Sequence, residues 1–252
     1  MKEPPLSATE EPLRQQDELA DLREKLARHE RFLSTLAHEM RNCLYTIMLS
    51  ADTWQRAPEH GDTCSATLVR QTRQLTRMAE DLGDSGRIAQ RRLSLKVRET
   101  DLRTILQDAI AGCRPVIEEA RHTLSVQIPD EPFPLKGDPD RLLQVLINLI
   151  GNAIKYTPEG GLLALSAKKD GSCAEVSVRD NGTGIPPDKL DAVFVMFEQL
   201  EPHTTAGARG LGIGLSLAKS LVEMHGGEIW AKSDGAGRGT EVSFRLPLSE
   251  RP

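Results

Sequence analysis

The sequence predicts an α+β protein: an antiparallel helical hairpin that forms a dimeric four-helix bundle, followed by an α/β sandwich. A heptad repeat runs without Gly or Pro through a long helical segment between about Leu13 and Trp54. Pro and Gly at residues 57–62 then interrupt the pattern, and a second helical segment follows. From Asp101 onward, strand-like alternation mixes with helical periodicity, which predicts a layered sheet with helices on one face.

The first helix carries an apolar seam with alternating spacings of three and four residues. Its members, at the a and d positions of about three heptads, are Leu19, Leu22, Leu26, His29, Leu33, Leu36 and Met40. The neighbouring positions, such as residues 23–25 and Arg28, are charged, as on the exposed faces of a coiled coil. A single long helix packed on its own domain is the alternative, but so regular a repeat favours a facing helix and therefore a parallel homodimer.

The remaining elements follow from periodicity and breakers. A second helix is expected over residues 63–88, with Leu68, Leu75, Met78 and Leu82 on its apolar side, and antiparallel to the first. A connector with a short strand at 92–97 follows. Further helices are expected at 102–119, 139–153 and about 211–225, and strands at 162–168, 174–179, 228–232 and 241–246. The predicted limits are 1–12 for a disordered N-terminus, 13–90 for the coiled coil and hairpin, 91–100 for a linker and 101–252 for the second domain.

Composition narrows the functional classes. A net charge of −5 over 252 residues argues against general affinity for nucleic acid, which requires a basic surface. No apolar run approaches the roughly 20 residues that span a bilayer, so no membrane segment is expected in this chain. The four cysteines form no C-x-x-C pair, which indicates a reduced, cytoplasmic protein rather than a disulfide framework or a zinc site.

His38 is the first candidate for chemistry. With Leu33 at a and Leu36 at d, His38 falls at f, the position that points away from the seam. A neutral imidazole there is available as a nucleophile. Glu39 beside it can orient the ring and accept its proton, and Asn42 one turn later can hold a water. The alternative is a surface histidine without a role; a zinc-protease H-E-x-x-H motif is excluded because the fifth residue is Asn42.

A polar stripe on the helix of residues 140–155 is the second candidate. Gln144, Asn148, Asn152 and Lys155 lie on one face of this otherwise apolar helix. Amide oxygens are hard ligands suited to Mg²⁺, and a lysine suits a phosphate. An ordinary hydrogen-bond network in the core is the alternative.

Two glycine-rich loops complete the set. Asp180, Gly182 and Gly184 directly follow a predicted strand, where the carboxylate can accept a hydrogen bond from an exocyclic amine of a flat ring. Residues 207–215 then open a helix whose N–H groups can bind phosphates. This loop is neither a Walker loop nor a Rossmann fingerprint, because no Gly-Lys-Ser/Thr follows it and no strand directly precedes it. Flexible hinges are the alternative; the segment 194–208 is expected to act as a lid.

In this order, the motifs closely resemble those of bacterial two-component sensor histidine kinases, over about residues 31–248. The segment 32–42 resembles the phospho-acceptor box, 148–157 the asparagine box, and 180–184, 194–197 and 210–214 the glycine and phenylalanine boxes; Gly239 and Thr240 match the last one. The resemblance implies a dimerisation and phospho-acceptor hairpin followed by a Bergerat-type ATP-binding domain. It also implies autophosphorylation of His38 by ATP, phosphotransfer to the receiver domain of a cognate response regulator, and a phosphatase activity.

The resemblance also assigns roles to individual residues. Asp180 would bind the adenine amine with support from Thr240, and Tyr156 would line the pocket. Asn148 and Asn152 would hold Mg²⁺ against the phosphates, and Lys155 would contact a phosphate. Glu39 would be the base for His38, and Asn42 would position water for dephosphorylation. The nucleotide-binding set is Asn148, Asn152, Lys155, Tyr156, Asp180, Gly182, Gly184, Gly210, Gly212, Gly214, Leu215 and Thr240.

One position departs from the family pattern. Cys43 stands where the family usually has a proline, five residues after the histidine, so the first helix is expected to be straighter. A pseudokinase scaffold is a competing hypothesis, but every residue expected to carry chemistry is present. Other ATPases of the same nucleotide fold, such as the gyrase or mismatch-repair type, and an anti-sigma serine kinase are disfavoured because they need no exposed histidine on a dimer hairpin. An upstream sensor module is expected; neither its signal nor the identity of the regulator follows from the sequence.

Overall fold

The computed structural model describes residues 10–198 and 211–249 of the chain. The chain divides into two compact units, residues 1–76 and 77–252. The division falls inside the second long helix rather than in the predicted linker at 91–100. The last turns of that helix therefore belong to the same compact unit as the sheet.

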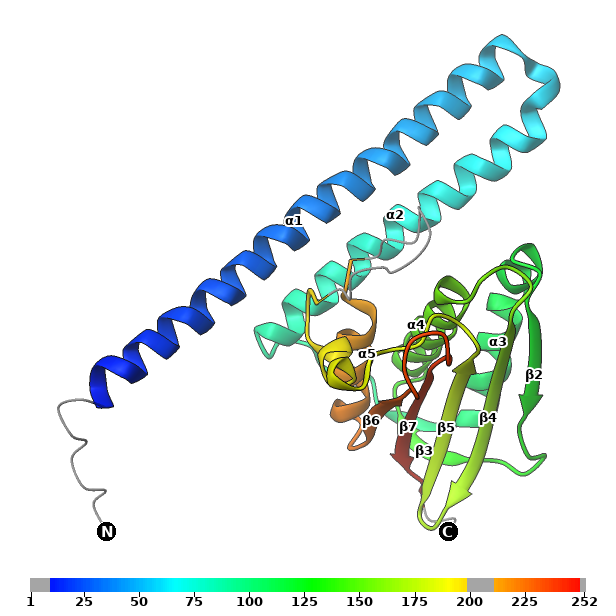
Figure 1. Ribbon diagram of the computed structural model, residues 1–252. Coiled ribbons are helices and arrows are strands. Elements are labelled where there is room, and N and C mark those ends of the chain that lie inside the picture. Colours follow the sequence, from blue (N-terminus) through cyan, green and yellow to red (C-terminus); the bar gives the residue numbers. More distant parts are fainter. Residues whose placement is uncertain (1–9, 199–210, 250–252) are drawn as a thin grey trace. The chain divides into compact units, whose positions relative to one another are not determined.

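Two long helices and a tight turn form the N-terminal part of the chain (Figure 1). Helix α1 spans Glu10–Arg56, a single 3-10 turn, η1, covers Pro58–His60, and helix α2 spans Gly61–Ala89. The predicted helical hairpin is confirmed. Residues 10–12, which were predicted to be disordered, form the first turn of α1, whereas residues 1–9 lie outside the described part. Helix α1 runs unbroken through Cys43, in agreement with the absence of the usual proline.

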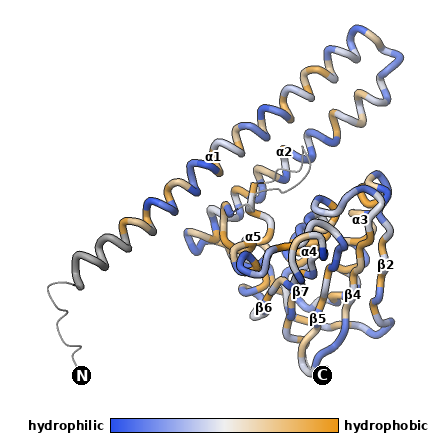
Figure 2. The backbone as a smooth tube through the Cα atoms, in the orientation of Figure 1, coloured by the Kyte–Doolittle hydropathy of each residue, from blue (hydrophilic) through white to orange (hydrophobic). Residues whose placement is uncertain are grey.

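Along α1, buried and exposed apolar side chains form separate stripes. Figure 2 shows hydrophobic positions recurring between polar ones along α1 and α2. Phe32 and Cys43 are buried, whereas Leu26, Leu33 and Met40 of the predicted seam are exposed in this single chain. A row of exposed leucines on a helix is unfavourable in water. Coverage of this seam by a second copy stays a prediction.

The second unit is built on two sheets. Strands β1 (Arg98–Asp101) and β3 (Pro134–Gly137) form a small antiparallel pair. The main sheet has the order β2-β4-β5-β7-β6, in which only β2 and β4 are parallel. Its strands are β2 (Thr123–Gln127), β4 (Leu162–Asp170), β5 (Cys173–Asp180), β6 (Glu228–Lys232) and β7 (Glu241–Pro247).

Three helices cover one face of the main sheet (Figure 1). They are α3 (Leu102–Glu119), α4 (Pro139–Tyr156) and α5 (Gly214–Met224); two 3-10 turns, η2 (Pro187–Lys189) and η3 (Ala192–Phe194), precede α5. Alternate residues of the central strands, such as Leu165, Val176 and Phe244, are buried toward the helices. On the opposite face lie polar residues, among them Ser177 and Ser243, whose hydroxyls are 2.6 Å apart. The predicted layered α/β arrangement is confirmed.

The predicted strand at residues 92–97 is wrong. The backbone N–H of Lys96 donates to the Asp138 carboxylate instead of to a neighbouring strand, and pairing begins only at Arg98. Strands β2 and β3 were not predicted. Strand β2 is a five-residue edge strand with little buried surface, and β3 is four residues long and begins with Pro134. Helix α5 begins at Gly214 instead of Leu211.

Asp138 ties the start of α4 to two other segments. Its carboxylate accepts hydrogen bonds from the backbone N–H groups of Asp140 and Arg141 (3.2 and 3.3 Å), which caps the helix, and from that of Lys96 (2.8 Å). Its own N–H donates to Nε2 of His225 at the end of α5 (2.9 Å). The ring Nδ1 lies 2.7 Å from the Leu221 carbonyl oxygen, a contact in which Nδ1–H donates to that carbonyl. The N-terminus of α4 is therefore held on three sides.

Asp101 plays the corresponding role for α3, and its removal should destabilise the second unit. The carboxylate accepts from the N–H of Arg103 (3.0 Å) and from the N–H of Phe133 (2.8 Å). Asp101→Ala removes a cap and leaves a second donor without its acceptor, so we expect a loss of about 2–3 kcal/mol in the free energy of unfolding. Urea unfolding followed by circular dichroism measures it. Asp108→Ala, on the exposed face of the same helix, is the control; equal losses in the two variants would contradict the capping role.

Candidate functional site

A buried carboxylate at the end of β5 organises the glycine-rich part of the fold. Asp180 is 9% exposed, and its Oδ1 accepts from the backbone N–H of Gly182 (2.8 Å) and of Thr240 (3.1 Å). Burial raises the pKa of Asp180, and the two backbone hydrogen bonds oppose that rise. Because both of these donors use Oδ1, Oδ2 is left to accept from a ligand. The structure thus brings together Asp180 and the backbone of Thr240, the two residues that the family resemblance placed in one site.

The loop after β5 and the loop between β6 and β7 are hydrogen-bonded to each other. Gly239 N–H donates to the Gly182 carbonyl (3.1 Å), and Gly237 N–H donates to that of Thr183 (2.6 Å). Ser233 joins both loops, since its hydroxyl donates to the Gly239 carbonyl (2.6 Å) and accepts from the N–H of Ile185 (2.9 Å). Sequence reasoning missed Ser233; its place between a strand and a glycine-rich segment was the available signal.

Glycine is required here because backbone packs on backbone. A Cβ on Gly182 would collide with the carbonyl of Tyr156, the last residue of α4. Gly239 has a φ of +74°, and a Cβ there would collide with the Asp180 carbonyl. Because both positions are glycine, the backbones of the two loops pack directly on Asp180 and on the C-terminal end of α4.

Helix α4 contributes the polar stripe that the sequence singled out, with one correction. Asn148 donates from Nδ2 to the carbonyl of Gly214 at the start of α5 (3.3 Å). Asn152 follows one turn later and is partly exposed. Lys155 places its ammonium 3.0 Å from the Tyr156 hydroxyl and 4.5 Å from the centre of that ring. Gln144, grouped with these residues from the sequence, instead bonds Asp81 and Asp84 of α2 and Arg141.

The start of α5 provides a second set of donors. No side chain caps this helix at Ile213, and no acidic residue lies in its first turn. The N–H groups of its first turn, which include those of Gly214 and Leu215, therefore have no partner within the helix and suit an anion. Gly212 precedes them with a φ of +67°. The predicted site residue Gly210 lies outside the described residues, as does most of the expected lid.

These features fit a nucleotide with its metal. A carboxylate oxygen of Asp180 has no donor among the described residues and lies among glycines, whose lack of side chains keeps space beside it open. Amide oxygens of the kind that hard cations prefer follow on α4, and uncapped N–H groups begin α5. Acceptor, cation ligands and phosphate donors thus come from three elements of one compact unit, namely β5, α4 and α5.

The predicted phospho-acceptor residues lie on α1, in the first unit. His38 and Asn42 are exposed, and Glu39 is partly buried. The Asn42 side chain stays available, because Thr46 bonds only its backbone carbonyl (2.9 Å). Burial raises the pKa of the neighbouring Cys43 thiol, with a further contribution from the Glu39 carboxylate. This cysteine is therefore an inert, protonated packing residue at neutral pH.

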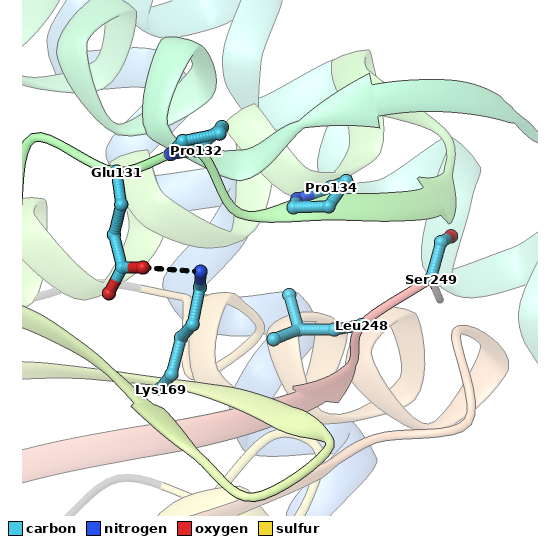
Figure 3. Close-up of a pocket in the computed structure, with 6 residues that line it drawn as sticks. All are labelled: Glu131, Pro132, Pro134, Lys169, Leu248 and Ser249. Carbon is cyan, nitrogen blue, oxygen red and sulfur yellow. Dashed lines mark hydrogen bonds and ion pairs between the residues drawn. The ribbon is translucent and has the colours of Figure 1, made fainter. Parts of the chain in front are cut away.

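A small cavity lies apart from these residues. It measures about 270 Å³, and Figure 3 shows its lining from Glu131, Pro132, Pro134, Lys169, Leu248 and Ser249. The two charged side chains pair with each other (2.6 Å). None of the candidate residues lines this cavity, so it is no part of the candidate site.

Comparison with known proteins bears on both parts of the chain. Residues 28–91 match the family described as the His Kinase A (phospho-acceptor) domain. Residues 137–250 match the family described as histidine kinase-, DNA gyrase B- and HSP90-like ATPases. Within the described residues, no helix has the length and hydropathy needed to cross a membrane.

Individual relatives agree with these families. The chain is 31% identical over 245 residues to the adaptive-response sensory kinase SasA of Synechococcus elongatus, with 92% of this chain and 62% of the relative covered. It is 32% identical over 220 residues to the sensor histidine kinase RcsC of Escherichia coli K12, covering 86% of this chain and 23% of the relative. Full-length ShkA, solved in complex with AMPPNP, superposes with a TM-score of 0.64 at 26% identity, over 87% of this chain and 46% of ShkA. The chain thus spans less than two thirds of these relatives.

The crowding around Gly239 predicts a specific loss of nucleotide binding. Gly239→Ala would push the Thr240 N–H away from Asp180, so we expect the affinity for an ATP analogue to fall about tenfold or more. Gly237→Ala is the matched control, because its φ of +72° is similar but no atom lies within 4 Å of the added Cβ. Titration with a fluorescent ATP analogue measures both variants. Equal losses would mean that backbone strain, and not the contact with Asp180, determines the effect.

Proposed function

The chain belongs to the sensor histidine kinases, and from that premise we propose that it uses ATP to phosphorylate its own His38. The phosphoryl group then passes to an aspartate in the receiver domain of a response regulator. The observation that carries this proposal is the buried carboxylate of Asp180 between two interlocked glycine loops, in a chain that also exposes His38. An adenine amine that donates to Oδ2 of Asp180 would complete the hydrogen bonding of that carboxylate.

The transfer needs an imidazole nucleophile and a base. A ring nitrogen of His38 attacks the γ-phosphorus of ATP, the bond to the bridging oxygen breaks, and ADP leaves. Glu39 is the residue that accepts the ring proton, because it is adjacent and only partly buried. Catalysis of this step depends on placement and charge neutralisation more than on covalent chemistry by the protein.

The phosphates would be held by three groups of the second unit. Lys155, on the last turn of α4, would supply a positive charge beside Tyr156, which would line the nucleotide site. The first N–H groups of α5, at Gly214 and Leu215, supply neutral donors. Asn148 and Asn152 are the residues that would hold Mg²⁺, which neutralises phosphate charge when bound. Because Nδ2 of Asn148 donates to the Gly214 carbonyl, Oδ1 of Asn148 is the atom that would bind the cation.

The wider assembly is part of the proposal. The exposed seam of Leu26, Leu33 and Met40 supports a homodimer through α1. The predicted coiled coil at the start of α1 suits transmission from an upstream sensor module. Use of ATP and four free thiols, at Cys43, Cys64, Cys113 and Cys173, support a cytoplasmic location.

Labelling with γ-³²P-ATP and Mg²⁺ tests the kinase activity. The wild-type protein should acquire a label that is stable to alkali and labile to acid, and His38→Ala should lose it completely, because no other group is the nucleophile. His60→Ala, at an exposed histidine in η1, should label like the wild type. A scaffold without catalysis would give no label on the wild type, and retention of the label by His38→Ala would contradict the assignment.

Asn42 separates the proposed phosphatase activity from the kinase. Asn42→Ala should leave the initial rate of labelling within about twofold of wild type and slow dephosphorylation of the phosphorylated regulator about tenfold, since its amide would position the attacking water. Single-turnover assays with the phosphorylated regulator measure the second rate. Gln55→Ala, at an exposed amide near the end of α1, is the control. If Asn42→Ala dephosphorylates the regulator at the wild-type rate, Asn42 does not position the attacking water.

A further inference from the structure

The last turns of α2 are bound to α4 through one buried aspartate. Asp84 is 1% exposed, yet it carries three side-chain hydrogen bonds. Its Oδ1 accepts from Arg87 (2.6 Å), and its Oδ2 accepts from Arg141 (2.5 Å) and Gln144 (3.1 Å) of α4. Burial raises the pKa of Asp84, but the hydrogen bonds from these three residues outweigh it and lower the pKa overall. Asp84 is therefore ionised, and the guanidinium groups of Arg87 and Arg141 compensate its negative charge.

The partners of Asp84 bond one another as well. Arg141, only 25% exposed, donates to Oε1 of Gln144 (2.8 Å), which fixes the amide so that Nε2 faces α2. That Nε2 also lies 3.2 Å from Oδ1 of Asp81, one turn before Asp84. Removal of one member of such a network leaves charges buried without partners, which is more damaging than loss of an exposed pair. We call these four residues, Asp81, Asp84, Arg141 and Gln144, the α2–α4 clamp.

The clamp lies on the same helix as the proposed metal ligands. Gln144 precedes Asn148 by one turn and Asn152 by two turns on a continuous helix. Residues 77–89 of α2 belong to the same compact unit as α4. Helix α2 is also continuous, through η1, with the helix that bears His38. One further contact supports the clamp: in the connector that follows α2, the backbone N–H of Lys96 donates a hydrogen bond to Asp138 at the start of α4.

We propose that Asp84 is a positioning residue for phosphoryl transfer: through Arg141 and Gln144 it makes the last turns of α2 and the helix of Asn148 and Asn152 one rigid piece. The proposal rests on the proposed role of these two asparagines. A displacement of about 1 Å at reacting atoms is enough to lower a rate by two orders of magnitude. Loosening the clamp therefore acts on the transfer rate, while the nucleotide pocket around Asp180 stays intact.

The test separates binding from transfer. Asp84→Asn should lower the rate of His38 labelling at saturating ATP about tenfold and leave the affinity for an ATP analogue within about twofold of wild type. Arg141→Gln should have the same effect. Asp130→Asn, which removes an exposed ion pair with Arg103 (2.7 Å) in the same unit, should change neither quantity. A rate within twofold of wild type, or a loss of affinity that accounts for the whole effect, would overturn the proposal.

A double-mutant cycle covers the case in which a single variant is destabilised. If Asp84 and Arg141 act through one contact, the double variant should label at the rate of the slower single variant; independent, multiplied losses would overturn the proposal. Thermal unfolding verifies that each variant is folded at the assay temperature, and hydrogen exchange of residues 81–89 should increase in both single variants. Asn152→Ala is measured alongside. If this variant leaves the Mg²⁺ dependence of nucleotide binding unchanged, the metal assignment is wrong. The clamp proposal is judged separately, by the labelling rates of the Asp84 variants.

Discussion

The nucleotide half of this protein depends on a buried carboxylate that the fold must satisfy. An aspartate at the end of a central strand is unfavourable in the interior unless donors reach it. The donors to Asp180 are backbone N–H groups of Gly182 and Thr240, which belong to loops separated by more than fifty residues. Glycines at the contact positions are the consequence, because any side chain there would separate the loops. The hydrogen bonds that fix the two loops around Asp180 are therefore present without a ligand, and such preorganisation lowers the entropic cost of binding.

Helix α4 is the second constraint, because it is fixed along its whole length. Asp138 joins its first turn to the connector and to His225, Arg141 and Gln144 join the next turn to α2, and its last carbonyl, on Tyr156, accepts from the N–H of Thr183. Between these attachments lie Asn148 and Asn152. If these two asparagines hold Mg²⁺ as proposed, a helix with so many fixed points would need little rearrangement to bind the ion, which is the property that a phosphoryl-transfer site requires.

Helix α1, which carries the proposed phospho-acceptor His38, differs from these elements because its important side chains are exposed. His38 and Asn42 are exposed, as their proposed roles require, and apolar residues such as Leu26 and Leu33 are exposed as well. Cys43 is compatible with an unbroken helix, where the usual proline would remove a backbone hydrogen bond. Without that proline, nothing in the sequence favours a kink at this position of the helix, and the clamp holds the last turns of α2 against α4 within the second unit.

The sequence by itself determined the helices and most strands, because burial of one face leaves a local, periodic trace: the helix at 102–119 and the strand at 228–232 match the structure exactly. The family resemblance, although not the residue pattern alone, also implied that Asp180 and Thr240 belong to one site. Only the tertiary structure decided what has no local trace. Gln144 shares a helical face with Asn148, yet it bonds α2. Residues 92–97 form no strand, because the N–H of Lys96 donates to Asp138 instead. Ser233 and Asp84 acquire their roles from partners that are distant in the chain. Periodicity records whether a side chain is buried, whereas the identity of its partner depends on long-range packing.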